Sequence, residues 1–169
     1  YVSSLLMLGP HLRGPLTLVL SGRTVSEPYI AMTAAVMARF GARVQRQAAD
    51  RWQVHPGGYQ AGDFAVEADA SSASYGAAAA VLTSTTVCIP GLPVDSLQGD
   101  AGFLDLVASL GARVERGPQG VNVSGRPMQA GERTFDMGAM PDMVPTLALL
   151  AAFRQGRTRI SGVSHLRLK

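Results

Sequence analysis

A repeat with a period of about 70 residues restricts the fold of this chain more than any other feature. Phe40-Gly41-Ala42-Arg43-Val44 returns 70 positions later as Leu110-Gly111-Ala112-Arg113-Val114, with four of the five residues identical. Each copy follows an amphipathic helical pattern, and each glycine is placed to end that helix. A second helical pattern, followed each time by a strand that ends in glycine, recurs in a matching register at residues 3–11, 71–82 and 142–153.

The repeated unit predicts helix, strand, helix, strand, strand, which is an α/β (α+β) arrangement. Ser26 and Asp100 are expected to cap the two amphipathic helices. A further strand, Phe64 to Glu67 or Arg133 to Met137, is expected to lead into the next unit. Because the period is longer than in common solenoids, we expect packed sub-domains rather than a stacked array.

Composition predicts a folded chain without a membrane span. Hydrophobic residues make up 47% and charged residues 16% of the sequence, so a sizeable core is possible. The most apolar run, Thr146 to Phe153, has eight residues, far fewer than the roughly 20 that a transmembrane helix needs. The chain lacks a signal-peptide pattern, and its single Cys88 lies in an apolar run, as a small core residue does. We therefore expect a cytoplasmic location.

Charge and ligand types narrow the possible partners. All five charged side chains from position 154 onward are basic, a pattern that attracts phosphate or carboxylate or forms a solvated edge. No basic stripe with interleaved aromatic residues predicts nucleic-acid binding. The three histidines (His11, His55 and His165) lack the spacing of metal ligands.

Five motifs occur in an order that is typical of one enzyme family. They are Val25-Ser26-Glu27-Pro28-Tyr29-Ile30, the string from Val66 to Tyr75, Gln98-Gly99-Asp100, Pro141-Asp142, and Leu166-Arg167-Leu168-Lys169. Together they resemble the 5-enolpyruvylshikimate-3-phosphate synthase family, the 3-phosphoshikimate 1-carboxyvinyltransferases. The resemblance covers the chain from Tyr1 to Lys169.

The resemblance implies a fold and a domain division. The family has six βαβαββ units in a two-domain, inside-out α/β fold, and this chain then is an incomplete, interior fragment of it. Residues 1–68 are expected to be the last repeat unit of one globular domain. Residues 69–169 are expected to start the second domain with one full and one partial unit, and a hinge is expected near residues 67–69. Ala68 stands where the family usually has Gly, so a positive φ there would be strained.

The resemblance also implies a reaction. The family transfers the carboxyvinyl group of phosphoenolpyruvate to the 5-hydroxyl of 3-phosphoshikimate and releases phosphate, in aromatic amino-acid biosynthesis. Its two anionic substrates require cationic clamps and a carboxylate that moves a proton, but no metal or organic cofactor. We expect no nucleic-acid or membrane partner, and we expect the remainder of the enzyme to be needed to complete the site.

The motifs assign roles to five residues by resemblance. Asp142 is expected to open a helix and to accept the proton, while binding and orienting substrate hydroxyls. Lys169 is the second expected catalytic residue and contacts 3-phosphoshikimate. Ser26, Tyr29 and His165 are expected to bind 3-phosphoshikimate as well, with His165 at a position where some relatives have Asn. Asp69, Asp100 and Gln98 are expected to be structural, as two helix caps and a turn residue.

Two alternative functions stay open from the sequence. One is the related transferase that acts on UDP-N-acetylglucosamine, although Cys88 in its apolar strand does not replace that enzyme's loop cysteine. The other is a noncatalytic fragment or assembly module, since the Lys and Arg groups that grip phosphoenolpyruvate in the family have no counterpart here. The string from Asp69 to Tyr75 favours the shikimate enzyme.

Overall fold

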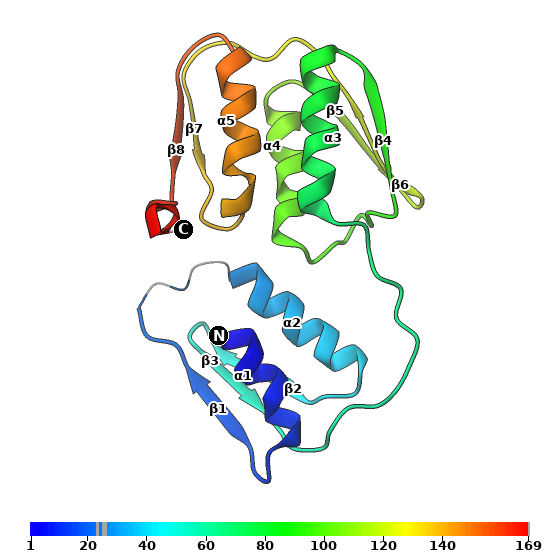
Figure 1. The fold of residues 1–169 in the computed structure, drawn as a ribbon, viewed down its shortest axis with the longest axis vertical. Coiled ribbons are helices and arrows are strands. Elements are labelled where there is room, and N and C mark those ends of the chain that lie inside the picture. The colour runs from blue at the N-terminus through cyan, green and yellow to red at the C-terminus, as the bar shows by residue number, and fades with distance from the viewer. Residues whose placement is uncertain (23, 25–26, 169) are drawn as a thin grey trace. The chain divides into compact units, whose positions relative to one another are not determined.

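The chain folds into two compact units, Tyr1–Ala65 and Val66–Lys169, called the first and second unit below (Figure 1). The computed structural model describes residues 1–22, 24 and 27–168. Each unit has its own hydrophobic core, built on its own sheet and helices.

The first unit packs two helices on a three-stranded antiparallel sheet of order β1-β3-β2. Its core contains Leu6, Ile30 and Trp52. The elements are α1 (Val2–Leu8), a 3-10 turn η1 (Gly9–His11), β1 (Leu16–Val19), α2 (Glu27–Arg39), β2 (Val44–Ala48) and β3 (Arg51–Val54).

The second unit packs three helices against a three-stranded antiparallel sheet, β4-β6-β5, and a parallel pair, β7-β8. Its elements are α3 (Ala70–Thr83), β4 (Thr86–Pro90), η2 (Gly99–Gly102), α4 (Phe103–Ser109), β5 (Arg113–Gly117), β6 (Gly120–Ser124), β7 (Arg133–Asp136), η3 (Pro141–Met143), α5 (Val144–Phe153), β8 (Thr158–Ser161) and η4 (Ser164–Leu168).

The sequence repeat is also a repeat of strand register. Leu16 faces Val54 in the first unit, and 70 positions later Thr86 faces Ser124 in the second. The glycines predicted to end the amphipathic helices do so with positive φ, +80° at Gly41 and +116° at Gly111. A side chain is disfavoured in this left-handed region, so glycine is the residue that lets the chain turn from helix to strand.

Helix α3 lies at the centre of the second unit because its side chains are small. It packs against both α4 and α5. Its buried positions are nearly all Ala or Ser, which allow close approach of neighbouring helices: Ala70, Ala73, Ser74, Ala77, Ala78, Ala80 and Val81.

Two sequence predictions about secondary structure and burial were wrong. Cys88 is exposed rather than buried, because alternation along β4 turns Val87 and Ile89 inward and Cys88 outward. Residues 64–67 form no strand, unlike their repeat counterpart β7. That segment crosses the boundary between the units, and only a single backbone bond, from Ala68 N to Gly91 O at 2.9 Å, joins its end to the region of β4.

The expected strain at Ala68 and the expected helix cap at Asp100 are not found. Ala68 is not strained, since Ser84 is the only non-glycine residue with positive φ in the described part of the chain. Asp100 does not cap a helix: it lies inside η2, where it is 3% exposed, and Gln98 holds the N-cap position. Asp69 does cap α3, as predicted, by accepting the Ser71 N–H at 2.9 Å.

Candidate functional site

The three helices of the second unit begin at the same end of that unit. Helices α3, α4 and α5 lie side by side, and each returns through a strand that runs the opposite way (Figure 1). The unpaired backbone N–H groups of a helix N-terminus carry partial positive charge and favour anions. This end of the second unit therefore offers an environment suited to anionic ligands.

Asp142 lies at this end, just before α5. It is exposed and stands between two buried residues, Pro141 and Met143, which anchor the short turn η3 to the core. Pro141 starts the turn because it has no N–H to leave unpaired. The N-cap of α5 is Met143, so the expectation that Asp142 opens the helix as its cap was wrong by one residue.

His165 follows the end of β8, one strand of the parallel pair β7-β8. Strands β7 and β8 end in register at Asp136 and Ser161, so the segments that follow them leave the sheet together. Asp136 Oδ1 accepts the Gly138 N–H at 2.9 Å. It also approaches Gly162 so closely that a Cβ there would lie 2.0 Å from the oxygen, which fixes the segment leading to His165.

The imidazole of His165 is half-buried, and its Nε2 atom is shielded from solvent. Within the part of the chain that the structure describes, Nε2 has no hydrogen-bond partner. A buried polar atom of this kind is normally paired, so it marks a position where a ligand group or water could bind.

Tyr29 belongs to the first unit, in the first turn of α2, where it is half-buried. Its carbonyl oxygen accepts a hydrogen bond from Thr33 Oγ1 at 2.7 Å, and the hydroxyl oxygens of Thr33 and Ser3 of α1 are hydrogen-bonded at 2.9 Å. The two helices thus hold this turn in place. Ser26 and Lys169 lie outside the described residues. Of the predicted site residues, the structure brings Asp142 and His165 to one edge, while Tyr29 is on the other unit.

A polar network surrounds the start of α3. Asp69 accepts from Ser72 Oγ at 2.6 Å and from the Ser71 N–H. These bonds hold the pKa of the Asp69 carboxyl below its ordinary value because they favour the charged form, and the bond from Ser72 has the largest effect. Ser71 Oγ donates to the buried Asp100. Sequence reasoning placed Asp69 and Asp100 in a specific motif, but this link between α3 and η2 had no signal in periodicity.

Arg154 was expected to belong to a basic end that attracts anions or forms a solvated edge, but it is 6% exposed and has a structural role. Its guanidinium donates to Gly131 O at 2.7 Å and Gln129 O at 2.8 Å, and also to Thr158 Oγ1. These carbonyls belong to the loop before β7. Arg154 therefore supplies the donors that this loop lacks.

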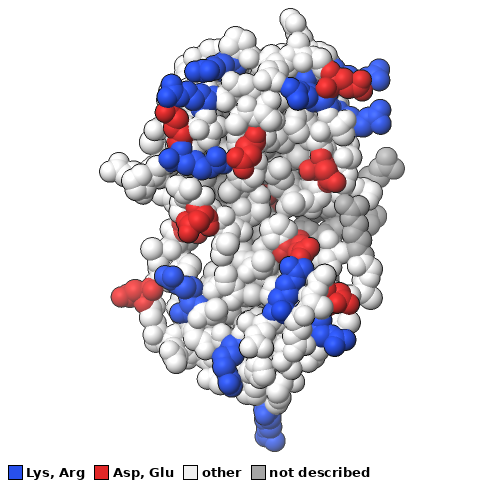
Figure 2. Space-filling model, turned by 180° about the vertical axis from the view of Figure 1, so that it is seen from behind, with Lys and Arg blue, Asp and Glu red and all other residues white. Residues whose placement is uncertain are grey.

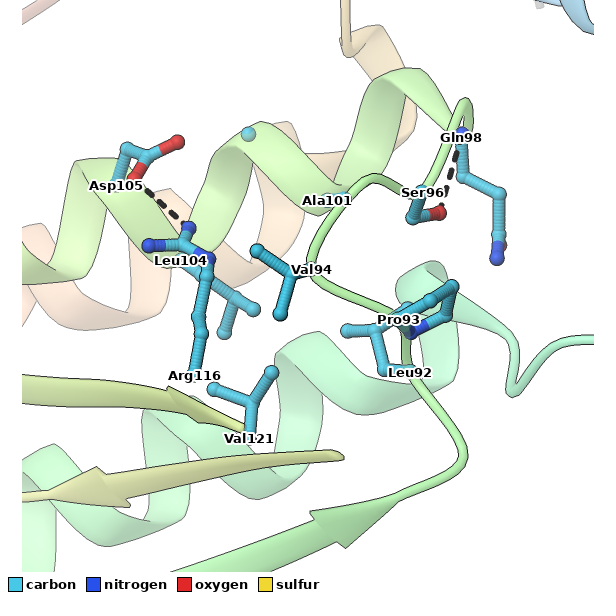
Figure 3. Close-up of a pocket in the computed structure, with 11 residues that line it drawn as sticks. Leu92, Pro93, Val94, Ser96, Gln98, Ala101, Leu104, Asp105, Arg116 and Val121 are labelled. Atoms are coloured by element: carbon cyan, nitrogen blue, oxygen red, sulfur yellow. Dashed lines mark hydrogen bonds and ion pairs between the residues drawn. The ribbon is translucent and has the colours of Figure 1, made fainter. Parts of the chain in front are cut away.

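A separate pocket of about 380 Å³ opens between the loop 92–98, α4 and the β5–β6 hairpin (Figure 3). Leu92, Val94, Leu104 and Val121 supply its apolar wall, and the ion pair of Arg116 and Asp105, at 2.8 Å, stands at one side. No predicted site residue lines this pocket.

Charge and ligand clusters on the described residues do not indicate another class of site. On the face in Figure 2, basic and acidic side chains are interspersed rather than gathered in one basic stripe. No group of three or more His, Cys, Asp or Glu side chains among the described residues is arranged to hold a metal ion. None of the described helices combines the length and apolarity that crossing a bilayer requires.

Solved structures share the fold. The enolpyruvyl transferase NikO from Streptomyces tendae matches 94% of this chain and 39% of its own, with a TM-score of 0.67 and 22% identity. An EPSP synthase from Acinetobacter baumannii matches 97% of this chain and 38% of its own, with a TM-score of 0.70 and 20% identity. The predicted fold class is thereby confirmed.

Sequence comparison identifies the family. A 3-phosphoshikimate 1-carboxyvinyltransferase of Syntrophobacter fumaroxidans is 44% identical over 173 residues, and one of Methanoculleus marisnigri is 40% identical over 177. Each match covers 100% of this chain and 40% of the relative, so the chain spans well under half the length of these relatives. The sequence profile described as EPSP synthase (3-phosphoshikimate 1-carboxyvinyltransferase) matches residues 1–169, and the chain belongs to that family.

Proposed function

We propose that this chain supplies part of the active site of an enzyme that transfers the carboxyvinyl group of phosphoenolpyruvate to the 5-hydroxyl of 3-phosphoshikimate. The hydroxyl oxygen adds to C2 of phosphoenolpyruvate while C3 gains a proton. The tetrahedral intermediate then loses phosphate and a C3 proton, which leaves the enol ether. The reaction belongs to aromatic amino-acid biosynthesis.

The observation that carries this proposal is the convergence at one end of the second unit. Three helix N-termini lie there, and those of α4 and α5 favour anions, as both substrates are, while at α3 the Asp69 carboxylate already accepts the Ser71 N–H. Asp142 lies in η3, which follows β7, and His165 lies in η4, which follows β8. The relatives that cover the whole chain carry the name of this activity, which favours it over the UDP-N-acetylglucosamine alternative.

Within this proposal Asp142 accepts the proton of the 5-hydroxyl and orients the sugar-like ring of the substrate. An exposed carboxylate on a turn anchored by two buried neighbours suits both tasks. His165 would bind 3-phosphoshikimate after a shift that uncovers its shielded Nε2 atom. Ser26, Tyr29 and Lys169 complete the 3-phosphoshikimate contacts, and the reaction uses no cofactor.

The proposal includes the division of the chain and its setting. Residues 1–65 would close one globular domain and residues 66–169 would begin the second, three residues before the division that the resemblance implied. The rest of the enzyme would supply the groups that hold phosphoenolpyruvate. The enzyme would act in the cytoplasm on small soluble substrates, without nucleic acid or membrane.

A graft tests the proposal. The Syntrophobacter fumaroxidans relative would carry this chain in place of its matching segment, and phosphate release from phosphoenolpyruvate would be measured with 3-phosphoshikimate. We expect turnover by the graft and none by the isolated chain. Asp142→Asn in the graft should lower kcat by roughly 100-fold or more, because the amide takes no proton.

The matched control is Asp95→Asn, which changes an exposed carboxylate of the second unit that is assigned no role in the reaction. Graft activity with UDP-N-acetylglucosamine alone would overturn the substrate assignment. Full activity of the Asp142→Asn graft would overturn the role of Asp142.

A further inference from the structure

The segment between the two units is held to the first unit almost to its end. It has no regular secondary structure from His55 to Asp69. The Gln60 N–H donates to Phe40 O at 2.8 Å, and the Phe64 ring lies 5.7 Å from the Phe40 ring between centroids. The first unit thus fixes the segment as far as Phe64.

The second unit fixes the segment from Glu67 onward through the Gln98 side chain and through the backbone bond from the Ala68 N–H to Gly91 O at 2.9 Å. Gln98 Nε2 donates to Glu67 Oε2 at 2.9 Å and to Ala68 O at 2.8 Å. Gln98 Oε1 accepts the Ala70 N–H at 2.9 Å. Both N–H donors and the carbonyl oxygen of the Gln98 amide therefore bind this segment, at Glu67, Ala68 and Ala70.

Ser96 strengthens the same attachment. Its hydroxyl donates to Glu67 Oε2 at 2.6 Å and accepts the Gln98 N–H at 3.3 Å (Figure 3 shows the second bond). The loop that carries Ser96 and Gln98 is anchored by Leu92, which is 1% exposed. Glu67 is thus attached, through this loop, to the core of the second unit.

Between these two attachments lie Ala65 and Val66. Both are exposed, Val66 at 85% of its surface. Neither makes a hydrogen bond to the described residues. The break between the compact units falls at this same peptide.

We infer that the joint between the units is confined to Ala65–Val66 and that Gln98 is the positioning residue that keeps it so short. Residues 67–69, where the family resemblance led us to expect a hinge, move with the second unit instead. The consequence for catalysis rests on the proposed function: residues on both units must meet around one substrate, so a short joint limits the arrangements that must be searched.

Loss of the Gln98 side chain would lengthen the joint from two free residues to about three, because the Ala68 N–H stays bonded to Gly91 O at 2.9 Å. The r.m.s. span of a free chain grows as the square root of its length, so the spread of distances between the units should increase by about 1.2-fold. The Asp69 cap and the α3 core are untouched by this change. The second unit should therefore stay folded, although less stable, because the Ala70 N–H loses its acceptor.

The test is a distance distribution between two spin labels on the complete chain. Cys88 is exposed on the second unit, and Asp50→Cys adds a site in an exposed turn of the first. Gln98→Leu should widen the distribution by about 1.2-fold, and Phe64→Ala should widen it from the other side. Ser96→Ala should do so to a smaller extent.

Gln47→Leu is the matched control, because Gln47 is an exposed glutamine of β2 whose amide bonds only Gln53 at 2.8 Å. Its distribution should be unchanged. A folded Gln98→Leu chain with the control's distribution would overturn the inference. If that variant does not fold, an unchanged distribution for folded Ser96→Ala and Phe64→Ala would overturn it equally.

A second readout separates this inference from the proposed function. In the active graft, Gln98→Leu should lower kcat/KM roughly tenfold, because the wider joint raises the entropic cost of assembling the site. Wider distances in an inactive graft would support the joint and count against the proposed function. Wider distances with unchanged turnover would overturn the catalytic consequence alone.

Discussion

Helices α1 and α3 occupy corresponding places in the two units, yet their surroundings differ. Helix α1 packs against α2 and leaves Leu5, Met7 and Leu8 about half exposed, at 45%, 48% and 51%. Helix α3 lies between α4 and α5 and buries most of its length with Ala and Ser. The repeat therefore sets the order and register of the elements. The number of helices packed against each helix decides how large its side chains can be.

The two units also allow separate measurement of their stability. Trp52 is the only tryptophan of the chain and is 6% exposed in the first unit. Its fluorescence reports unfolding of the first unit alone. Far-UV circular dichroism reports both units, so a change confined to the second appears only there.

The largest expected effect comes from Gly125→Ala, just after β6. A Cβ at Gly125 would lie 1.9 Å from Ala80 O in the backbone of α3, so the strand and the helix must move apart. We expect the free energy of unfolding of the second unit to fall by about 3 kcal/mol. The dichroism transition should shift and the Trp52 transition should not.

The control for Gly125 is His55→Ala, 70 positions earlier and also just after a strand, β3. This position holds a large, half-exposed side chain, so truncation should change stability by less than about 1 kcal/mol. Equal losses at the two positions would show that the units do not differ in packing as the structure indicates.

The second largest effect is expected from Arg154→Ala. Removal of the guanidinium leaves the carbonyls of Gln129 and Gly131 without this donor at a partly buried position, which should cost the second unit about 2 kcal/mol of unfolding free energy. Denaturant unfolding followed by dichroism measures it. Arg43→Ala removes an exposed arginine that donates to Pro56 O, and a loss there as large as at Arg154 would contradict the assigned role.

Elements and register were predictable because they depend on short-range rules. Helix stops at Gly41 and Gly111 and the alternation along β6 can be recognised in the residues themselves. The exposure of Cys88 was not predictable, since an apolar run does not tell which face of its strand is covered. Residues 64–67 resemble a strand, yet a strand needs a partner that pattern alone does not supply.

The candidate site was predictable only as a set of residues. Motif order pointed to Asp142 and His165. That both follow the same end of a strand pair depends on the parallel pairing of β7 with β8, which the motifs do not indicate. The clamp formed by Gln98 on Glu67 and Ala68 joins positions about 30 residues apart, and no periodicity connects them. Long-range hydrogen bonds between side chains leave no local pattern in a sequence.

A smaller effect is expected from Asp69→Ala at the start of α3, a helix that has a side-chain cap where α1 has none. Loss of the cap should lower the unfolding free energy by about 1 kcal/mol at neutral pH. The pKa of Asp69 in the folded chain lies below its ordinary value of 3.8, so the charged form stabilises the fold above that pH. This contribution is lost as the pH falls through the lowered pKa.

Unfolding of the wild type and of Asp69→Ala between pH 2 and 5 would measure this contribution, and the two curves should converge toward the acid end. Asp69→Asn keeps an acceptor without a titrating group, so its stability relative to Asp69→Ala should be constant across the range. A difference between wild type and Asp69→Ala that grows as the pH falls would contradict the sign.

The smallest expected effect is a difference in stability loss between two surface ion pairs, one on each unit. Arg46 of the first unit contacts Glu27, but it also donates to Ala49 O at 3.0 Å and lies 5.5 Å from the Trp52 ring centroid. Arg116 of the second unit contacts Asp105 at 2.8 Å. Since Arg46 keeps other contacts, Glu27→Gln should cost the first unit less than Asp105→Asn costs the second, with both below about 1 kcal/mol.

Both losses should disappear in about 1 M salt, where charges on the surface are screened within about 3 Å. Trp52 fluorescence measures the first and dichroism the second. A larger loss for Glu27→Gln would mean that the backbone and ring contacts of Arg46 depend on the carboxylate rather than hold the guanidinium independently. A loss that persisted in high salt would assign the Asp105 contact to packing instead of charge.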